Sequence, residues 1–397
     1  MAERNAAVGY AAIKKESVVG TAVTPNVYTP YYKQSIVTNF NIMEDTPVYG
    51  NRFKKFQHLR GSRSHGGNIV VMAEPDTAGY WLDMLLNKSA TSGSDPYTHT
   101  FGLSNTTNPN SYTLDVSFGS QVVRFFGVQA SNFNIAWEDE KMQFEIDVSA
   151  LGSFYGREIL SISGTTVNLK PDYNTDATKG LVASDLVSIV DPDGAVTTLN
   201  TTIASITDVD TVEVGASAAA FAVGDMLVLR PATPSLSLKT PFLWGKTQFF
   251  FAADDAAAMT ASATASNQTR LEPGTELSLM WEFEDDQGSK RSGAFDPASL
   301  IRTIGDYAFK LKKFFDTPED IKAWNALTKK ALVMRSYSGA SNQYEIQVHL
   351  NNMTMLTMPP ETESGGTIYS EQEFGGNYDA SDGKGMEVKV INAVSTI

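Results

Sequence analysis

Alternation of apolar and polar residues with a period of two is the feature that most constrains this 397-residue chain. In residues 141–150, Met142, Phe144, Ile146 and Val148 share one face, and charged or polar side chains occupy the other. Successive side chains of a strand point to opposite faces, so this pattern predicts a sheet with one buried and one solvated face. Similar alternation covers residues 35–43, 68–72, 113–118, 131–137, 276–284, 307–311, 344–350 and 386–391. We therefore expect a mainly β fold.

Only two segments have the spacing of an amphipathic helix. In residues 76–88, Trp81, Leu82 and Leu85 repeat at three-to-four spacing after an Asp-Thr pair that can cap the first amides. Residues 317–330 open with Thr-Pro-Glu-Asp, which supplies an N-cap, a first-turn proline and acids at the positive end of the helix dipole. Each predicted sheet unit therefore packs one helix.

The order of strand, loop, strand, capped helix and further strands occurs twice in the chain. This predicts a duplicated β-sandwich or barrel unit, although two unrelated α+β stretches would give the same order. Residues 159–230 between the copies are poor in aromatics and rich in short β-formers and turn residues, which indicates a small all-β inserted domain. The expected domains are residues 1–155 with an N-terminal arm, the insert 156–234, and a second unit 235–397.

Composition excludes several classes of protein. The chain has no cysteine, so disulfides, thiolate metal sites and thiol nucleophiles are excluded. It has neither a signal-peptide start nor an apolar run of about 20 residues, so no membrane span is expected. Its net charge of −14 argues against a protein that binds nucleic acid along its surface.

Enzyme and metal signatures are weak. The four histidines, His58, His65, His99 and His349, have no metal-ligand spacing, and His349 is expected on the solvated face of a strand. The Asp191-Pro192-Asp193-Gly194 sequence matches only the start of a calcium loop and is interpreted as a tight turn. Phosphate-binding glycine loops and Gly-x-Ser-x-Gly elbows are absent from the sequence. We expect no catalytic, cofactor or metal site, while a carboxylate pair for glycoside hydrolysis is a tertiary feature that sequence does not test.

One segment is basic and aromatic in an otherwise acidic chain. Between residues 52 and 63 the charge is +5 with no acid, and the segment is predicted to form the tip of an extended hairpin. A solvated loop, a nucleic-acid contact and a subunit contact are all compatible with it; an arm of one sign on a body of the other suits head-to-tail association. The candidate contact residues are Arg52, Phe53, Lys54, Lys55, Phe56, Arg60 and Arg63.

Acidic residues recur on the polar faces of the predicted strands. The clearest are Glu145 and Asp147 in one strand, and Glu282 and Glu284 in another. Such residues ordinarily form a solvated sheet surface. If copies of the chain closed into a ring with these faces inward, the bore would instead be acidic and would repel a polyanion.

The order of several motifs resembles that of tail tube proteins from long-tailed bacteriophages. The opening motifs are Gly9-Tyr10-Ala11-Ala12-Ile13-Lys14-Lys15-Glu16, Val19-Gly20-Thr21 and Tyr28-Thr29-Pro30. Further motifs are Gly66-Gly67, Tyr97-Thr98-His99-Thr100-Phe101, Ser111-Tyr112-Thr113-Leu114-Asp115-Val116, Phe125-Phe126-Gly127-Val128 and the closing strand 144–152. The resemblance covers about three quarters of the chain, and residues 159–230 resemble a small decoration domain.

This resemblance implies a structural virion protein. Tube domains of this family form stacked six-fold rings through which DNA is ejected, and the ring-stacking arm falls on residues 50–66, with a weaker counterpart at 285–305. Two tube domains per chain would give a pseudo-hexameric trimer, with a hexamer as the alternative. The implied partners are further copies, other tail proteins at the tube ends, and DNA that passes without specific binding. The protein would be assembled in the host cytoplasm and found in the phage tail.

Two other functions are compatible with the sequence. A carbohydrate-binding β-sandwich adhesin or baseplate component would show exposed aromatics on the insert, which has almost none. A glycoside hydrolase would need a buried carboxylate pair in a cleft.

Overall fold

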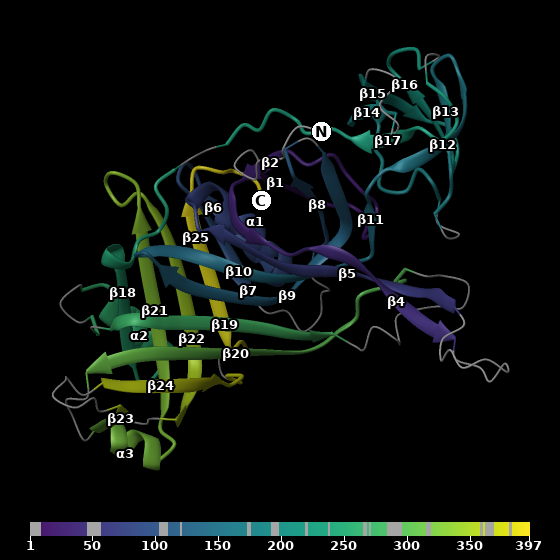
Figure 1. The fold of residues 1–397 in the computed structure, drawn as a ribbon. Coiled ribbons are helices and arrows are strands. Elements are labelled where there is room, and N and C mark those ends of the chain that lie inside the picture. The colour runs from purple at the N-terminus through teal and green to yellow at the C-terminus, as the bar shows by residue number, and fades with distance from the viewer. Residues whose placement is uncertain are drawn as a thin grey trace.

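The computed structural model describes residues 9–45, 57–102, 110–119, 121–172, 176–191, 198–218, 221–236, 239–264, 268–269, 271–283, 296–314, 319–357, 360–361, 369–380 and 383–397. This part of the chain is mainly β with three α-helices, which confirms the predicted fold class (Figure 1). The capping residues Thr317 and Pro318 and most of the predicted turn at 191–194 lie outside the described residues.

The first half is built around β9 (Val122–Glu138), a long strand shared by two layers. One layer contains β1 (Ala11–Lys15), β2 (Val27–Thr29), β8 (Tyr112–Ser117) and β11 (Gly152–Phe154) beside the first part of β9. The other contains β3 (Tyr31–Gln34), β4 (Val37–Asp45), β5 (Gln57–Met72) and β10 (Lys141–Ala150) beside its second part. Strand β5 starts well before the predicted residue 68, because residues 57–66 pair with β4.

Helix α1 (Pro75–Leu85) packs at the centre of the molecule, where Trp81, Leu82 and Leu85 are buried as their spacing predicted. The predicted cap is wrong. The helix starts earlier, after Glu74, because Pro75 supplies the φ angle of the first helical position. Asp76 lies inside the first turn and accepts a hydrogen bond of 3.0 Å from Lys239 Nζ.

The second half is joined to the first by two strand pairings. Strand β19 (Glu272–Phe283) pairs with β9, and β25 (Met386–Asn392) pairs with β7 (Tyr97–Gly102). Its other strands are β18 (Thr247–Ala252), β20 (Arg302–Phe314), β21 (Lys329–Ser338), β22 (Tyr344–Thr357), β23 (Pro360–Glu361) and β24 (Tyr369–Gly376), and β6 (Asn87–Gly93) pairs with β7. One hydrophobic core runs through both halves. The duplication stays a prediction.

Two short helices accompany the second half. Helix α3 (Glu319–Asn325) lies within the predicted segment, whereas α2 (Asp255–Ser262) was not predicted. Asp254 caps α2 by accepting a 2.8 Å hydrogen bond from the Ala257 amide, and Ala258 packs in a small core with Phe250 of β18. The signal that we overlooked is an Asp-Asp pair ahead of an alanine-rich run.

Helix α2 also explains an error about β22. His349 was expected on a solvated face, but it is buried, and its Nδ1 lies 3.7 Å from Asp255 Oδ1 of α2. Glu345 on the same strand is buried too and pairs with Arg335 of β21 at 2.5 Å. The polar face of this sheet is therefore covered.

Residues 157–229 form a closed six-stranded barrel beside the rest of the molecule (Figure 1). Its strands are β12 (Arg157–Ser163), β13 (Thr166–Leu169), β14 (Leu186–Val190), β15 (Leu199–Ile206), β16 (Thr211–Val214) and β17 (Met226–Leu229). Antiparallel pairs connect them in the circuit β12, β13, β16, β15, β14, β17 and back to β12. The barrel has its own hydrophobic core, and Leu229 pairs with Val122 of β9. The domain boundaries at 155 and 234 stay predictions.

Candidate functional site at the β4–β5 hairpin

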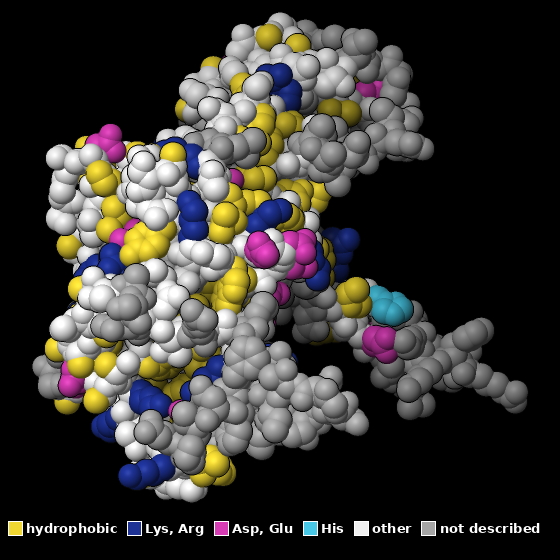
Figure 2. Space-filling model, turned by 90° about the vertical axis from the view of Figure 1, so that its left-hand side faces the viewer, with side chains coloured by type: hydrophobic (Ala, Val, Ile, Leu, Met, Phe, Trp, Pro, Cys, Tyr) yellow, Lys and Arg dark blue, Asp and Glu magenta, His cyan; other side chains and the backbone are white. Residues whose placement is uncertain are grey.

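The β4–β5 hairpin stands away from the body in both views (Figures 1 and 2). Strand β4 pairs with β5 and, among the described residues, with no other strand. Apolar side chains of the hairpin face solvent: Val37, Phe40, Ile42, Met43 and Leu59 are 38–59% exposed. An isolated two-stranded ribbon is marginally stable, and an apolar strand edge is a template for pairing with another chain. The hairpin therefore has the properties of an interaction surface.

The predicted basic segment falls partly on this hairpin. Arg52, Phe53, Lys54, Lys55 and Phe56 lie outside the described residues, as do residues 285–295 of the second predicted arm. Arg60 is exposed on β5, and its guanidinium carbon lies 4.9 Å from the centre of the Phe40 ring. Such a cation–π contact attracts the guanidinium to the face of the ring.

Arg63 lies in a different environment from Arg60. It is buried, and its guanidinium donates to Asp172 Oδ2 at 2.5 Å and to Asp296 Oδ2 at 2.7 Å. His65 Nε2 lies 3.0 Å from Asp296 Oδ1. Burial alone would raise the pKa of Asp296, but the contacts with His65 and Arg63 lower it to about 2. Arg63 therefore ties the hairpin to the region beside β13 and to the second half.

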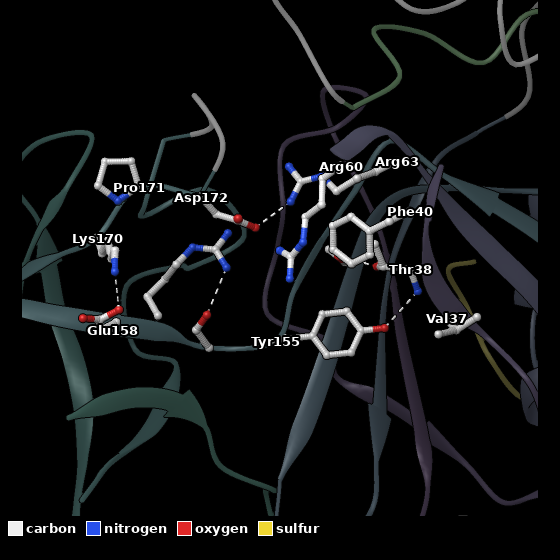
Figure 3. A pocket seen from close by; sticks show the side chains of 13 residues that line it. Val37, Thr38, Phe40, Arg60, Arg63, Tyr155, Glu158, Lys170, Pro171 and Asp172 are labelled. Atoms are coloured by element: carbon white, nitrogen blue, oxygen red, sulfur yellow. Dashed lines mark hydrogen bonds and ion pairs between the residues drawn. The ribbon is translucent and has the colours of Figure 1, made fainter. Parts of the chain in front are cut away.

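A cavity of about 690 Å³ lies between the hairpin and strands β12 and β13. Figure 3 shows Phe40, Arg60 and Arg63 facing Lys170, Pro171 and Asp172 across it. Tyr155 accepts a 3.0 Å hydrogen bond from the Thr38 amide, and Lys170 pairs with Glu158 at 2.6 Å. The remaining lining residues are Val37, Ser153, Gly156 and Arg157.

Arg157 is a cation that sequence reasoning missed. Its side chain is 7% exposed, Nη1 donates to the Gly156 carbonyl at 3.0 Å, and the guanidinium lies over the Phe154 ring. Among the described residues it has no ion pair, and Nε has no hydrogen-bond partner. Burial lowers the pKa of Arg157, an effect that Asp172 and Asp296 oppose and Arg63 reinforces.

A second buried arginine joins the same two regions. Arg124 of β9 contacts Asp115 of β8 at 2.7 Å and Asp185, which precedes β14, at 2.5 Å. The two carboxylates raise the pKa of Arg124 against the opposing effect of burial. Burial in turn raises the pKa of Asp115, although Arg124 lowers it. This cluster fixes the barrel to the first half.

The predicted acidic residues lie on the face shared by β10, β9 and β19. Glu145 is exposed, and Asp147 accepts hydrogen bonds from Asn68 at 2.9 Å and Asn132 at 3.2 Å. Glu145 is opposite Asn134, which in turn is opposite Ser278 of β19, so a polar row crosses from the first half to the second. Glu282 belongs to β19, but its side chain, like all of Glu284, lies outside the description.

Neither a metal-binding cluster nor a membrane-spanning helix is present among the described residues. No cluster of three or more His, Cys, Asp or Glu side chains there is suited to hold a metal ion. No helix in that part of the chain is long and apolar enough to cross a membrane.

The fold and the hairpin site define a structural β-sheet protein. The family model described as "Phage tail tube protein" matches residues 4–299, and the chain belongs to that family. This confirms the resemblance, identifies a structural protein of the phage tail, and does not point to a known enzyme family. The search of curated proteins gave no match.

Proposed function

We propose that copies of this chain close into rings, and that the rings stack into a tail tube through which DNA is ejected. The observation that carries the proposal is the pairing of β19 with β9 inside one chain, together with the open edge of β4. Further copies are the principal partners, and other tail proteins bind the tube ends.

The intrachain pairing supports a model for ring closure. In the proposed duplication, β4 and β5 of the first half correspond to β19 and β20 of the second. The outer edge of β19 is covered by β9 of the same chain, whereas β4 has no such partner among the described residues. A neighbouring copy that covered β4 would complete the same arrangement. Three two-unit chains would then form a pseudo-hexameric ring, with six chains as the alternative.

The acidic face supports a role as a DNA conduit. Glu145 and Asp147 share the polar row that continues onto β19, and Glu282 and Glu284 are proposed to extend it. A lumen lined by carboxylates would repel phosphate groups and would not retain DNA, because DNA binding depends on cations that displace its counterions.

The hairpin supports the stacking of rings. Its basic segment, Arg52 to Phe56 with Arg60, has the opposite sign to the net charge of the chain. Heterologous contacts between unlike surfaces repeat without closing, as a tube requires. Arg63 acts at the base of this arm, since its ion pairs are made within the chain.

Electron microscopy of the purified protein tests the proposal. We expect rings or tubes whose averaged end view shows three chains with pseudo-six-fold symmetry. A protein that stays monomeric at high concentration would contradict ring formation.

Reversal of Arg52, Lys54 and Lys55 to Glu should leave rings but shorten or abolish tubes. Tubes of unchanged length would contradict the arm assignment. Neither the carbohydrate-binding alternative nor the glycoside hydrolase has a specific observation in its favour.

A further inference from the structure

The cavity beside the hairpin contains a buried charge that the described chain leaves unmatched. Arg157 is more than nine-tenths buried and lines the cavity, and its guanidinium donates a hydrogen bond to the neutral Gly156 carbonyl but has no ion pair among the described residues. A buried charge is strongly unfavourable unless an opposite charge and hydrogen bonds accompany it. The acids nearby are already engaged, Glu158 with Lys170, Asp172 with Arg63, and Asp296 with Arg63 and His65. The site is therefore suited to receive a carboxylate from outside.

The walls of the cavity show what kind of group could carry that carboxylate. Val37, Phe40 and Tyr155 are each about two-fifths exposed and form an apolar wall. A volume of about 690 Å³ is far larger than a single ion needs, since one water occupies about 30 Å³. The fitting ligand is a turn of polypeptide with acidic residues beside an aromatic or aliphatic side chain.

This chain exposes such a turn at the other end of the same strands. Glu138, Asp139 and Glu140 connect β9 to β10, and all three are exposed. Tyr32 is 52% exposed, and burial, with smaller contributions from Glu74, Glu138 and Asp139, raises the pKa of its hydroxyl. The turn thus combines three carboxylates with an aromatic ring.

The turn and the cavity lie at opposite ends of β5. Strand β10 runs antiparallel to β5, with Gln143 near the acidic turn opposite Met72, and Ala150 opposite His65 near the cavity. The nine residue steps from Arg63 to Met72 span about 30 Å of strand. Acid and base at the two ends of one rigid strand pair are arranged for head-to-tail contact between copies.

We propose that the acidic turn 138–140 of one copy enters the Arg157 cavity of a second copy, and that this contact sets the order of successive rings. The inference rests on the proposed tube function. It adds a specific pair of surfaces to the general charge complementarity of the arm.

Replacement of Arg157 by Met tests the contact, because Met keeps much of the volume and removes the charge. We expect the concentration needed for polymerisation to rise about tenfold or more. The triple variant Glu138→Gln, Asp139→Asn, Glu140→Gln should have a similar effect, and adding Arg157→Met to it should give little further loss. The matched control is Lys179→Met, which removes an exposed cation of the barrel and should leave polymerisation unchanged.

The lack of cysteine allows a direct test of proximity. An Asp139→Cys variant and a Lys170→Cys variant, mixed and assembled under mild oxidation, should form disulfide-linked dimers. Asp208→Cys, on an exposed turn of the barrel, replaces Lys170→Cys in the control and should give none.

The outcomes separate this proposal from that of the tube. If the wild-type protein forms tubes but Arg157→Met polymerises equally well and no cross-link appears, the contact is wrong and the tube stands. If the wild type forms no tubes, a synthetic peptide of residues 136–142 still tests the cavity. Binding that Arg157→Met weakens would support the proposal. Lack of binding, or binding of a DNA oligonucleotide through Arg157 in place of the peptide, would overturn it.

Discussion

Arg124 and Arg157 are both buried where the barrel meets the first half, yet their surroundings differ. Arg124 is 2% exposed and contacts two carboxylates, Asp115 and Asp185. Arg157 is 7% exposed and contacts none among the described residues. A buried arginine side chain therefore plays a different role at each of the two positions. Arg124 is satisfied and holds two parts of the molecule together, whereas Arg157 is arranged to gain from a group that the single chain does not supply.

Glu74 extends this comparison to an acid. It is 2% exposed, and its Oε2 accepts no hydrogen bond within the described chain. Burial, with a smaller contribution from Asp76, raises the pKa of Glu74 to about 7. A buried carboxylate can avoid the energetic cost of a buried charge by taking up a proton. A guanidinium cannot, because it stays charged at any physiological pH. An unmatched buried arginine is therefore the stronger indication of a missing partner.

Loss of Arg124 should have the largest effect. Arg124→Met leaves Asp115 and Asp185 buried without their partner, so we expect the free energy of unfolding to fall by about 3–5 kcal/mol. Denaturant titration of the unassembled protein measures this. A loss below about 1 kcal/mol would show that the cluster is not the link we describe. The comparison variant is Arg335→Met, whose ion pair with Glu345 is more exposed and should contribute less.

Replacement of Glu74 by Gln should stabilise the protein in a pH-dependent way. Because the folded pKa of about 7 lies above the ordinary 4.5, wild-type stability falls as pH rises from about 4.5 through 7. A shift of this size corresponds to about 3 kcal/mol. We expect Glu74→Gln to be the more stable protein at pH 8 and equal to wild type near pH 4. Parallel stability curves across this range would contradict the assignment.

Replacement of Asp296 by Asn should have a smaller effect of the opposite sign. The folded pKa of about 2 lies below the ordinary 3.8, so the stabilisation is present above about pH 4 and is lost as pH falls through 2. We expect Asp296→Asn to lose about 2 kcal/mol at pH 7, with the difference narrowing in acid. Thermal unfolding between pH 7 and 2 measures it, and a difference independent of pH would exclude an electrostatic origin.

The smallest effect on the unassembled chain is expected for Arg157→Met. Removal of an unmatched buried charge should leave the unfolding midpoint unchanged or raise it, in direct contrast to Arg124→Met. A large loss of stability would show that Arg157 is satisfied within the chain. We therefore expect Arg157→Met to fold as well as the wild type but to polymerise less well, whereas Arg124→Met should be destabilised.

The sequence predicted strands and helices correctly where the apolar face of a periodic pattern lies against a hydrophobic core. Residues 141–150 form a strand with the predicted buried face, because the apolar side chains of that strand face a core. His349 was misplaced because α2, almost a hundred residues earlier, covers its face, and periodicity within one strand carries no such information. The basic segment falls only partly on the described hairpin, and its role stays a prediction.

The candidate site could be predicted only in part. Arg60 and Arg63 were grouped because they are close in sequence, but Arg63 is buried against Asp172 and Asp296, which lie 109 and 233 residues away, whereas Arg60 is exposed beside Phe40. Arg157 was not predicted as a site residue, because it is a single basic residue that belongs to no motif or charge cluster in the sequence. Its significance comes from burial and from the lack of an ion pair among the described residues, and both are tertiary properties.

The strands of the barrel form a closed circuit of antiparallel pairs. A closed barrel offers no free strand edge, so many copies held side by side in a polymer cannot pair with one another or with a neighbouring tube. The chain enters the barrel at β12 and leaves it at β17, two strands that pair with each other, so both ends of the excursion lie close together. This is the geometry of an insertion site, and a different self-contained domain grafted there would have to supply a carboxylate for Arg124 in place of Asp185.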